Sequence, residues 1–91
     1  MDQEALKKKI EAALRKACLP DKTPTIELEA SNVSRVGGRV ISKRFAKMTQ
    51  TARQDLIWSF LDKSLTAHEA TQISFIVTDT KQEHDALQRA G

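Results

Sequence analysis

The chain has 91 residues, 40% hydrophobic and 30% charged, a size and balance typical of one globular domain spanning residues 1–91. No apolar run approaches the roughly 20 residues that cross a bilayer, and the only cysteine, Cys18, excludes an internal disulfide. The composition fits a reducing cytosolic or organelle-matrix setting, of which the cytoplasm is the predicted one, without a membrane partner.

The first predicted element is a helix that ends near Cys18. Its apolar residues recur at helical spacing and form one stripe: Leu6, Ile10, Ala13, Leu14 and Ala17. Pro20 disfavours helical geometry at the residue before it, which sets the end of the helix. Cys18 is expected to be a small packing residue, because a free cysteine is usually buried and a helix C-terminus does not activate a thiol.

Two strands are predicted next, over residues 25–30 and 35–45. In the first, Ile26 and Leu28 alternate with Glu27 and Glu29, the pattern of a half-buried strand. In the second, residues 36, 38, 40 and 42 share one face, and residues 35, 39, 41 and 43 share the other. The exposed glutamates are expected to pair across an antiparallel hairpin with Arg39 or Lys43.

Two positions fit the turn of this hairpin, Ser31-Asn32 and Gly37-Gly38. The first is favoured, with the glycines forming a kink or bulge within the second strand.

The remaining elements are a long helix, a strand and a short helix. The long helix is predicted to start near Thr49–Thr51, because Thr51 and Gln54 have capping-box spacing. Its buried stripe is expected to contain Ile57, Phe60, Leu61 and Leu65. Residues 64–72 are predicted to form a polar loop. Residues 73–79 are predicted to form a strand, whose apolar residues on both faces favour a central position in the sheet.

A second capping box, Thr80 to Glu83, predicts the start of the last helix, with Ala86, Leu87 and Ala90 facing inward. The order helix-strand-strand-helix-strand-helix predicts an α+β two-layer sandwich. Its three-stranded mixed sheet is expected to carry the helices on one face.

Residues 26–87 resemble the BolA-like family through three short motifs. Residues 40–45, Val-Ile-Ser-Lys-Arg-Phe, resemble the family's Val-Val-Ser-x-x-Phe strand end. Arg53 matches the first arginine of the Arg-His-Arg signature, and three residues follow at family spacing: Ile57, Trp58 and Leu61. Residues 80–83 resemble the family's Thr-Pro-x-Glu helix start. The resemblance implies the BolA-like fold, which is similar to that of K-homology type II domains.

The resemblance also implies an iron–sulfur cluster shared with a monothiol glutaredoxin, but the ligand positions differ here. Gln54 and Asp55 replace the histidine and second arginine of the signature. Gln72 or Ile73 stands where the family has a histidine at the start of its third strand. An amide is a poor iron ligand and an alkyl chain is none. The loop at residues 31–34, which supplies a ligand in some members, holds only Ser, Asn, Val and Ser. We therefore predict no metal and no cofactor.

No catalytic motif is present, so the protein is not expected to be an enzyme. The sequence contains no Gly-x-Ser-x-Gly, no phosphate-binding glycine loop and no credible Cys–His pair. His68 and His84 are separated from any second ligand at metal-site spacing and are expected to be surface residues.

A basic segment carries the functional hypothesis. The net charge is +3, and residues 35–53 contain six cations and no acidic residue. The expected partner-binding residues are Arg39, Lys43, Arg44, Lys47, Arg53 and Trp58. Tryptophan beside arginine is typical of protein–protein hot spots. The leading hypothesis is a regulatory adaptor that contacts a protein partner, for which the resemblance implies a monothiol glutaredoxin.

The alternative is a K-homology-like domain that binds single-stranded nucleic acid through the same segment. The Gly-x-x-Gly clamp of such domains is absent, and the chain has one tryptophan and three phenylalanines for base stacking. The oligomeric state is not predicted.

Overall fold

The computed structural model describes residues 3–30 and 35–90, and only the backbone of residues 88–90. The elements in chain order are α1 (Gln3–Ala17), β1 (Thr25–Ala30), β2 (Val36–Ile41), the 3₁₀ turn η1 (Lys43–Phe45), α2 (Gln50–Ser64), α3 (Ala67–Ala70), β3 (Ile73–Asp79) and α4 (Lys81–Ala90). No helix in this part of the chain is long and apolar enough to cross a membrane.

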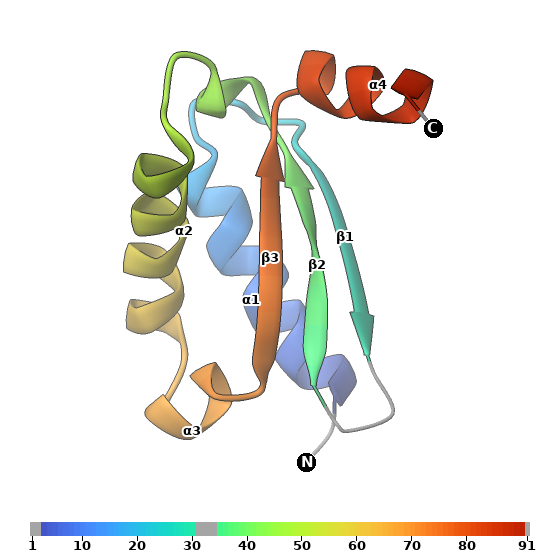
Figure 1. The fold of residues 1–91 in the computed structure, drawn as a ribbon. Coiled ribbons are helices and arrows are strands. Elements are labelled where there is room, and N and C mark those ends of the chain that lie inside the picture. Colours follow the sequence, from blue (N-terminus) through green and yellow to red (C-terminus); the bar gives the residue numbers. More distant parts are fainter. Residues whose placement is uncertain (1–2, 31–34, 91) are drawn as a thin grey trace.

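The sheet has the strand order β1-β2-β3, with β1 antiparallel to β2 and β3 parallel to it. Helices α1 and α2 cover one face, and α4 projects from the end of β3 over the other side (Figure 1). The predicted α+β two-layer fold with a three-stranded mixed sheet is confirmed, with α1 and α2 as the helical layer; α4 does not belong to that layer. The face away from α1 and α2 is otherwise open.

The core lies between α1, α2 and the covered face of the sheet. All five residues of the predicted α1 stripe are buried, as are Ile57, Leu61 and Leu65 of the α2 stripe. Phe60 is only partly buried and packs against this core. Cys18 is fully buried, as predicted, at the end of α1.

Strand β3 is at the edge of the sheet, so the predicted central position is wrong. A bulge places Ile73 and Ile76 on the same buried face although they are three positions apart, because Ile73 pairs with Val36 and Phe75 pairs with Gly37, leaving Ser74 without a partner residue. Beyond the bulge, Ile76 is buried against the helices, whereas Phe75 lies on the open face and is 59% exposed.

Strand β2 ends at Ile41, four residues earlier than predicted. Ser42 Oγ accepts a hydrogen bond from the Arg44 amide at 3.1 Å and donates one to Asp21 Oδ2 at 2.7 Å. This capping bends the chain into η1, so Lys43 and Arg44 leave the strand.

The ladder also decides between the two predicted turns. Gly37 and Gly38 pair with Glu29 and Leu28 inside the hairpin, so the turn does not lie there. The favoured Ser31-Asn32 turn lies outside the described residues. Gly38 is required by close approach, because a Cβ there would collide with the Glu27 carbonyl oxygen.

The helix starts agree with the sequence only in part. Helix α2 starts in the predicted range, but Thr49 Oγ1 caps it by accepting from the Ala52 amide, and not Thr51. The predicted loop at residues 64–72 contains α3, which has its own capping box from Thr66 to Glu69.

The capping box of α4 is confirmed. The Thr80 amide donates to Glu83 Oε1 at 2.9 Å, and the Glu83 amide donates to Thr80 Oγ1 at 3.2 Å. Ala86 and Leu87 are exposed rather than inward-facing, because α4 projects beyond the packed layers. The side chain of Ala90 lies outside the described residues.

Candidate interaction surface

Arg53, which we predicted to face a partner, is buried at the junction of three elements. Its side chain is 5% exposed. Nε donates to Met48 O and Nη1 donates to Thr78 O, both at 3.1 Å. The two Nη atoms donate to the Glu83 carboxylate at 2.6 and 3.0 Å. Arg53 therefore joins α2 to β3 and α4 inside the fold, and it is not part of an exposed surface.

The ion pair between Arg53 and Glu83 also shifts the pKa of both side chains. The hydrogen bond from Arg53 and the one from the Thr80 amide lower the pKa of Glu83 to about 2. The hydrogen bond to Glu83 raises the pKa of Arg53. Both groups are therefore charged at neutral pH, and their ion pair links α4 to α2.

Two glutamines of α2 occupy the outer edge of β3. Gln54 Nε2 donates to Ile76 O at 2.8 Å, and Gln50 Nε2 donates to Thr78 O at 3.2 Å. The Thr78 hydroxyl donates back to Gln50 Oε1 at 2.9 Å. Gln54, which stands at the position of the family's signature histidine, therefore donates a hydrogen bond to a backbone carbonyl of an edge strand.

The donor set does not fit an iron–sulfur cluster. Gln72 donates through Nε2 to Thr71 Oγ1 at 3.4 Å, and Ile73 is a buried alkyl side chain. His68 lies exposed on α3. Among residues 3–30 and 35–87, no three His, Cys, Asp or Glu side chains are grouped so that they could hold a metal ion.

Cys18 is not a reactive thiol. Burial raises its pKa and the nearby Asp21 charge adds to this, and the net pKa stays raised although the Ser42 hydrogen bond and the Arg44 and Arg15 charges lower it. The thiol is therefore protonated at neutral pH.

Three of the predicted cations lie together on η1 and the loop that follows it. Lys43 and Lys47 are exposed, and Arg44 is half-buried with Nη1 3.8 Å from Met48 Sδ. Lys47 has a φ of 66°, a conformation that is costly for a side chain other than glycine. These three residues form what we call the η1 basic cluster.

Arg39 lies apart from this cluster, on the open face of the sheet. Its Nε is 3.3 Å from Asp79 Oδ2, an ion-pair distance without hydrogen-bond alignment. The predicted pairing with Glu27 or Glu29 is wrong, although Glu27 is directly opposite Arg39 in the register. The Asp79 side chain is only 7% exposed, so a charge beside it is attracted more strongly than by a solvated glutamate.

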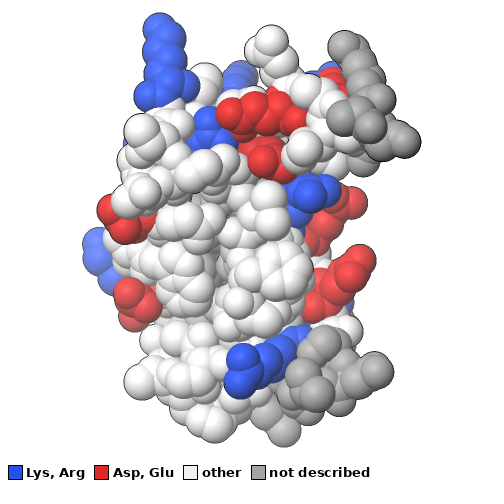
Figure 2. Space-filling model, in the orientation of Figure 1, with Lys and Arg blue, Asp and Glu red and all other residues white. Residues whose placement is uncertain are grey.

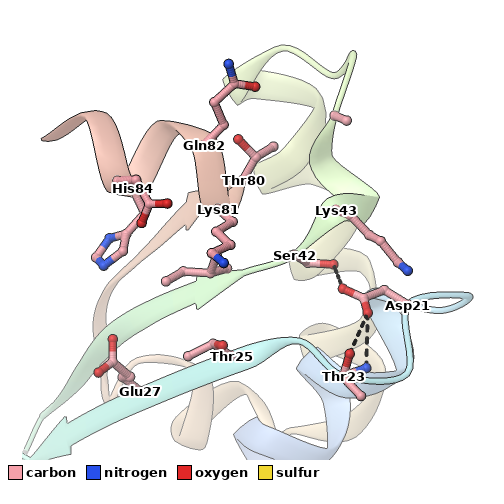
Figure 3. Close-up of a pocket in the computed structure, with 13 residues that line it drawn as sticks. Asp21, Thr23, Thr25, Glu27, Ser42, Lys43, Thr80, Lys81, Gln82 and His84 are labelled. Carbon is pink, nitrogen blue, oxygen red and sulfur yellow. Dashed lines mark hydrogen bonds between the residues drawn. The ribbon is translucent and has the colours of Figure 1, made fainter. Parts of the chain in front are cut away.

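A groove of about 590 Å³ separates the start of α4 from the start of β1 and the end of β2 (Figure 3). Its lining includes Asp21, Thr25, Ser42, Lys43, Lys81 and His84. Burial raises the pKa of Asp21, but the hydrogen bonds from Ser42, Thr23 and Lys43 outweigh it, and the pKa is lowered. The groove combines apolar surface, to which Ile41 and Ala46 contribute, with charges of both signs, and Lys43 of the η1 basic cluster belongs to its lining.

Trp58 is half-buried on α2, one helical turn after Gln54 and therefore on the side of the helix that faces the β3 edge. Figure 2 shows that the middle of the surface over α2 and β3 is uncharged, with charged side chains around it. Trp58 and the exposed Phe75 belong to these two elements.

No family model and no curated protein matches the sequence. Among solved structures, the crystal structure of a bol-like protein from Babesia bovis is similar, with a TM-score of 0.56. The two chains are 22% identical, and the match covers 91% of this chain and 93% of the other. The chain has a BolA-like fold. The fold implied by residues 26–87 is thus confirmed, whereas the ligand chemistry of the family has no counterpart among the described residues.

Proposed function

We propose that this protein is a non-enzymatic BolA-like adaptor that contacts a protein partner without ligating an iron–sulfur cluster. The proposal rests on what the residues at the first two positions of the family signature do in this fold. Arg53 and Gln54 both make hydrogen bonds within the fold, to Glu83 and to β3. The BolA-like fold is retained while the imidazole donors are replaced, which supports a role in contact rather than in cluster chemistry.

The η1 basic cluster and Trp58 form the proposed contact surface. Lys43 and Lys47 are exposed cations, and Trp58 offers a half-buried aromatic face on the following helix. Tryptophan and arginine dominate protein–protein hot spots, and the cations would attract an acidic partner surface. The partner implied by the resemblance is a monothiol glutaredoxin.

A nucleic-acid partner receives less support. Of the six cations between residues 35 and 53, Arg53 is buried and Arg39 is paired with Asp79. Arg35 precedes β2 and is therefore at the opposite end of that strand from η1. The three cations of the η1 basic cluster would give a salt slope of only about −2 to −3 on single or double strands.

Binding to a monothiol glutaredoxin, measured by calorimetry, tests the contact surface. Lys43→Glu/Lys47→Glu is expected to weaken binding at least about tenfold. The control Lys8→Glu/Lys16→Glu, which makes the same charge change at exposed positions of α1, is expected to have little effect. Equal weakening by both variants would contradict the proposed surface. A pull-down with and without nuclease identifies the alternative, because nuclease would then abolish capture.

Anaerobic reconstitution with iron, sulfide and a monothiol glutaredoxin tests the absence of ligation. We expect no visible absorption that depends on this chain. A coloured heterodimer that loses its colour in His68→Ala would contradict the proposal, since it would show a displaced imidazole ligand.

A further inference from the structure

The two edges of the sheet differ in how their backbone groups are used. On β3, the outward carbonyls of Ile76 and Thr78 accept hydrogen bonds from α2 side chains. On β1, no helix lies beside the outer edge of the strand (Figure 1). An uncovered strand edge is a template for pairing with another extended chain.

The ladder shows which groups β1 presents outward. The Val36 amide donates to Gln72 O, and the Ser42 amide donates to Asp79 O. The even-numbered residues of β2 therefore direct their backbone N–H and C=O groups toward β3. Because these directions alternate, the odd-numbered residues of β2 bond to their partners in β1, which include Glu27. The intervening Ile26 and Leu28 therefore direct N–H and C=O to the outer edge. No described residue outside the ladder bonds to these groups.

The side chains along this edge carry a pattern of charge. Glu27 and Glu29 are exposed on the open face, and Figure 3 shows Glu27 on the side of the sheet where α4 lies. Neither forms an ion pair within the described part of the chain, since Arg39 pairs with Asp79 instead. Several of the acidic side chains in Figure 2 lie along the margin where Figure 1 places β1, and others lie elsewhere on this face.

The other face of the edge borders a groove of about 470 Å³ between β1 and α1. Ile26 and Leu28, both half-buried, supply its apolar surface on β1, and the backbone of β1 brings Glu27 and Glu29 to its border. The α1 side carries charges of both signs: Glu4, Lys7, Lys8 and Glu11. An added strand would place alternate side chains in this groove and the others beside the two glutamates.

We propose that the edge of β1 binds an extended peptide segment in which basic residues alternate with apolar ones. The basic residues would lie opposite Glu27 and Glu29, about 5 Å away between Cβ atoms, and the apolar ones would enter the α1 groove. A second copy of β1 is disfavoured, because antiparallel pairing would bring its glutamates against these. The inference is independent of the proposed contact surface, which is on other elements.

Titration of the ¹⁵N-labelled full chain with a Thr-Lys-Val-Lys-Val-Lys-Thr peptide tests the proposal. We expect shifts concentrated on β1 and slowed amide exchange at Ile26 and Leu28. Glu27→Lys/Glu29→Lys is expected to weaken binding about tenfold or more, since two cross-strand pairs become repulsive. It should also bind the matching Glu-Val peptide better than the native chain does.

Asp55→Lys/Asp62→Lys is the matched control, because it makes the same charge change at exposed positions of α2. It is expected to leave peptide affinity within about twofold. Equal weakening by both double variants, shifts away from β1, or no binding at millimolar peptide would each overturn the proposal. If the lysine variant does not fold, Glu27→Gln/Glu29→Gln replaces it, with a smaller loss expected. Self-association through β1 in the free protein would also overturn it.

Discussion

Replacing Glu83 by glutamine isolates the ion pair that holds α4. Glutamine still fits the capping box with Thr80, so the start of the helix keeps its local support. Arg53 loses its anionic partner while its side chain remains 95% buried, with bonds only to Met48 O and Thr78 O. The substitution therefore removes the charge on α4 that neutralises Arg53.

The magnitude follows from the pKa of Glu83, which falls from its ordinary value of 4.5 to about 2. That depression corresponds to at most about 3 kcal/mol of folding free energy. The Glu83 side chain is 45% exposed, so solvent screening reduces the expected loss to about 1–2 kcal/mol at pH 7. Because the folded pKa is depressed, this stabilisation is complete above about pH 4.5 and is lost as the pH falls toward 2.

Urea unfolding of the native chain and Glu83→Gln, at several pH values between 2 and 7, measures this effect. The difference in unfolding free energy is expected to shrink toward zero near pH 2, while amide exchange in α4 becomes faster in the variant at pH 7. The control is Glu27→Gln, which neutralises an exposed carboxylate and should change stability by less than about 0.5 kcal/mol. A Glu83→Gln protein as stable as the native chain at pH 7 would refute the reasoning.

Three further predictions concern single positions. Lys47→Gly should stabilise the fold by about 0.5–1 kcal/mol in urea unfolding, because the φ of 66° no longer strains a Cβ; Lys47→Ala, which keeps the strain, should give no gain. Gly38→Ala should lower the free energy of unfolding by about 1–3 kcal/mol or more, because the new Cβ would meet the backbone of β1. Gly37→Ala should lower it by less than about 1 kcal/mol, because the new Cβ would meet the movable ring of Phe75. Equal losses would contradict this distinction. Cys18 should react with a maleimide roughly 100-fold or more slowly in the native state than in urea, since burial removes access and raises the pKa of the thiol; equal rates would show that the end of α1 opens freely.

Local patterns in the sequence were sufficient for most elements. The apolar spacing that predicts α1, the alternation that predicts β1, and the capping box of α4 all depend on residues within a few positions of each other. The end of β2 was predicted four residues too late, because Ser42 caps η1 and also bonds to Asp21, 21 positions away in the sequence.

The candidate site depended on contacts that no local pattern contains. In the sequence, Arg53 belongs to a basic segment. In the fold it is buried and pairs with Glu83, which is 30 positions later in the chain. In the sequence, Glu83 shows only the spacing of a capping box with Thr80, and that pattern does not indicate Arg53 as its partner.

The order of the longer helices and strands and the burial of one face of α1 follow from the sequence alone, because helix and strand periodicity are properties of neighbouring residues; the short elements η1 and α3 do not. The tertiary structure decided that β3 is at the sheet edge, that α2 side chains bond to that edge, and that the edge of β1 is uncovered. Which strands and side chains meet depends on how distant segments pack, and that choice is made only when the whole core is buried together.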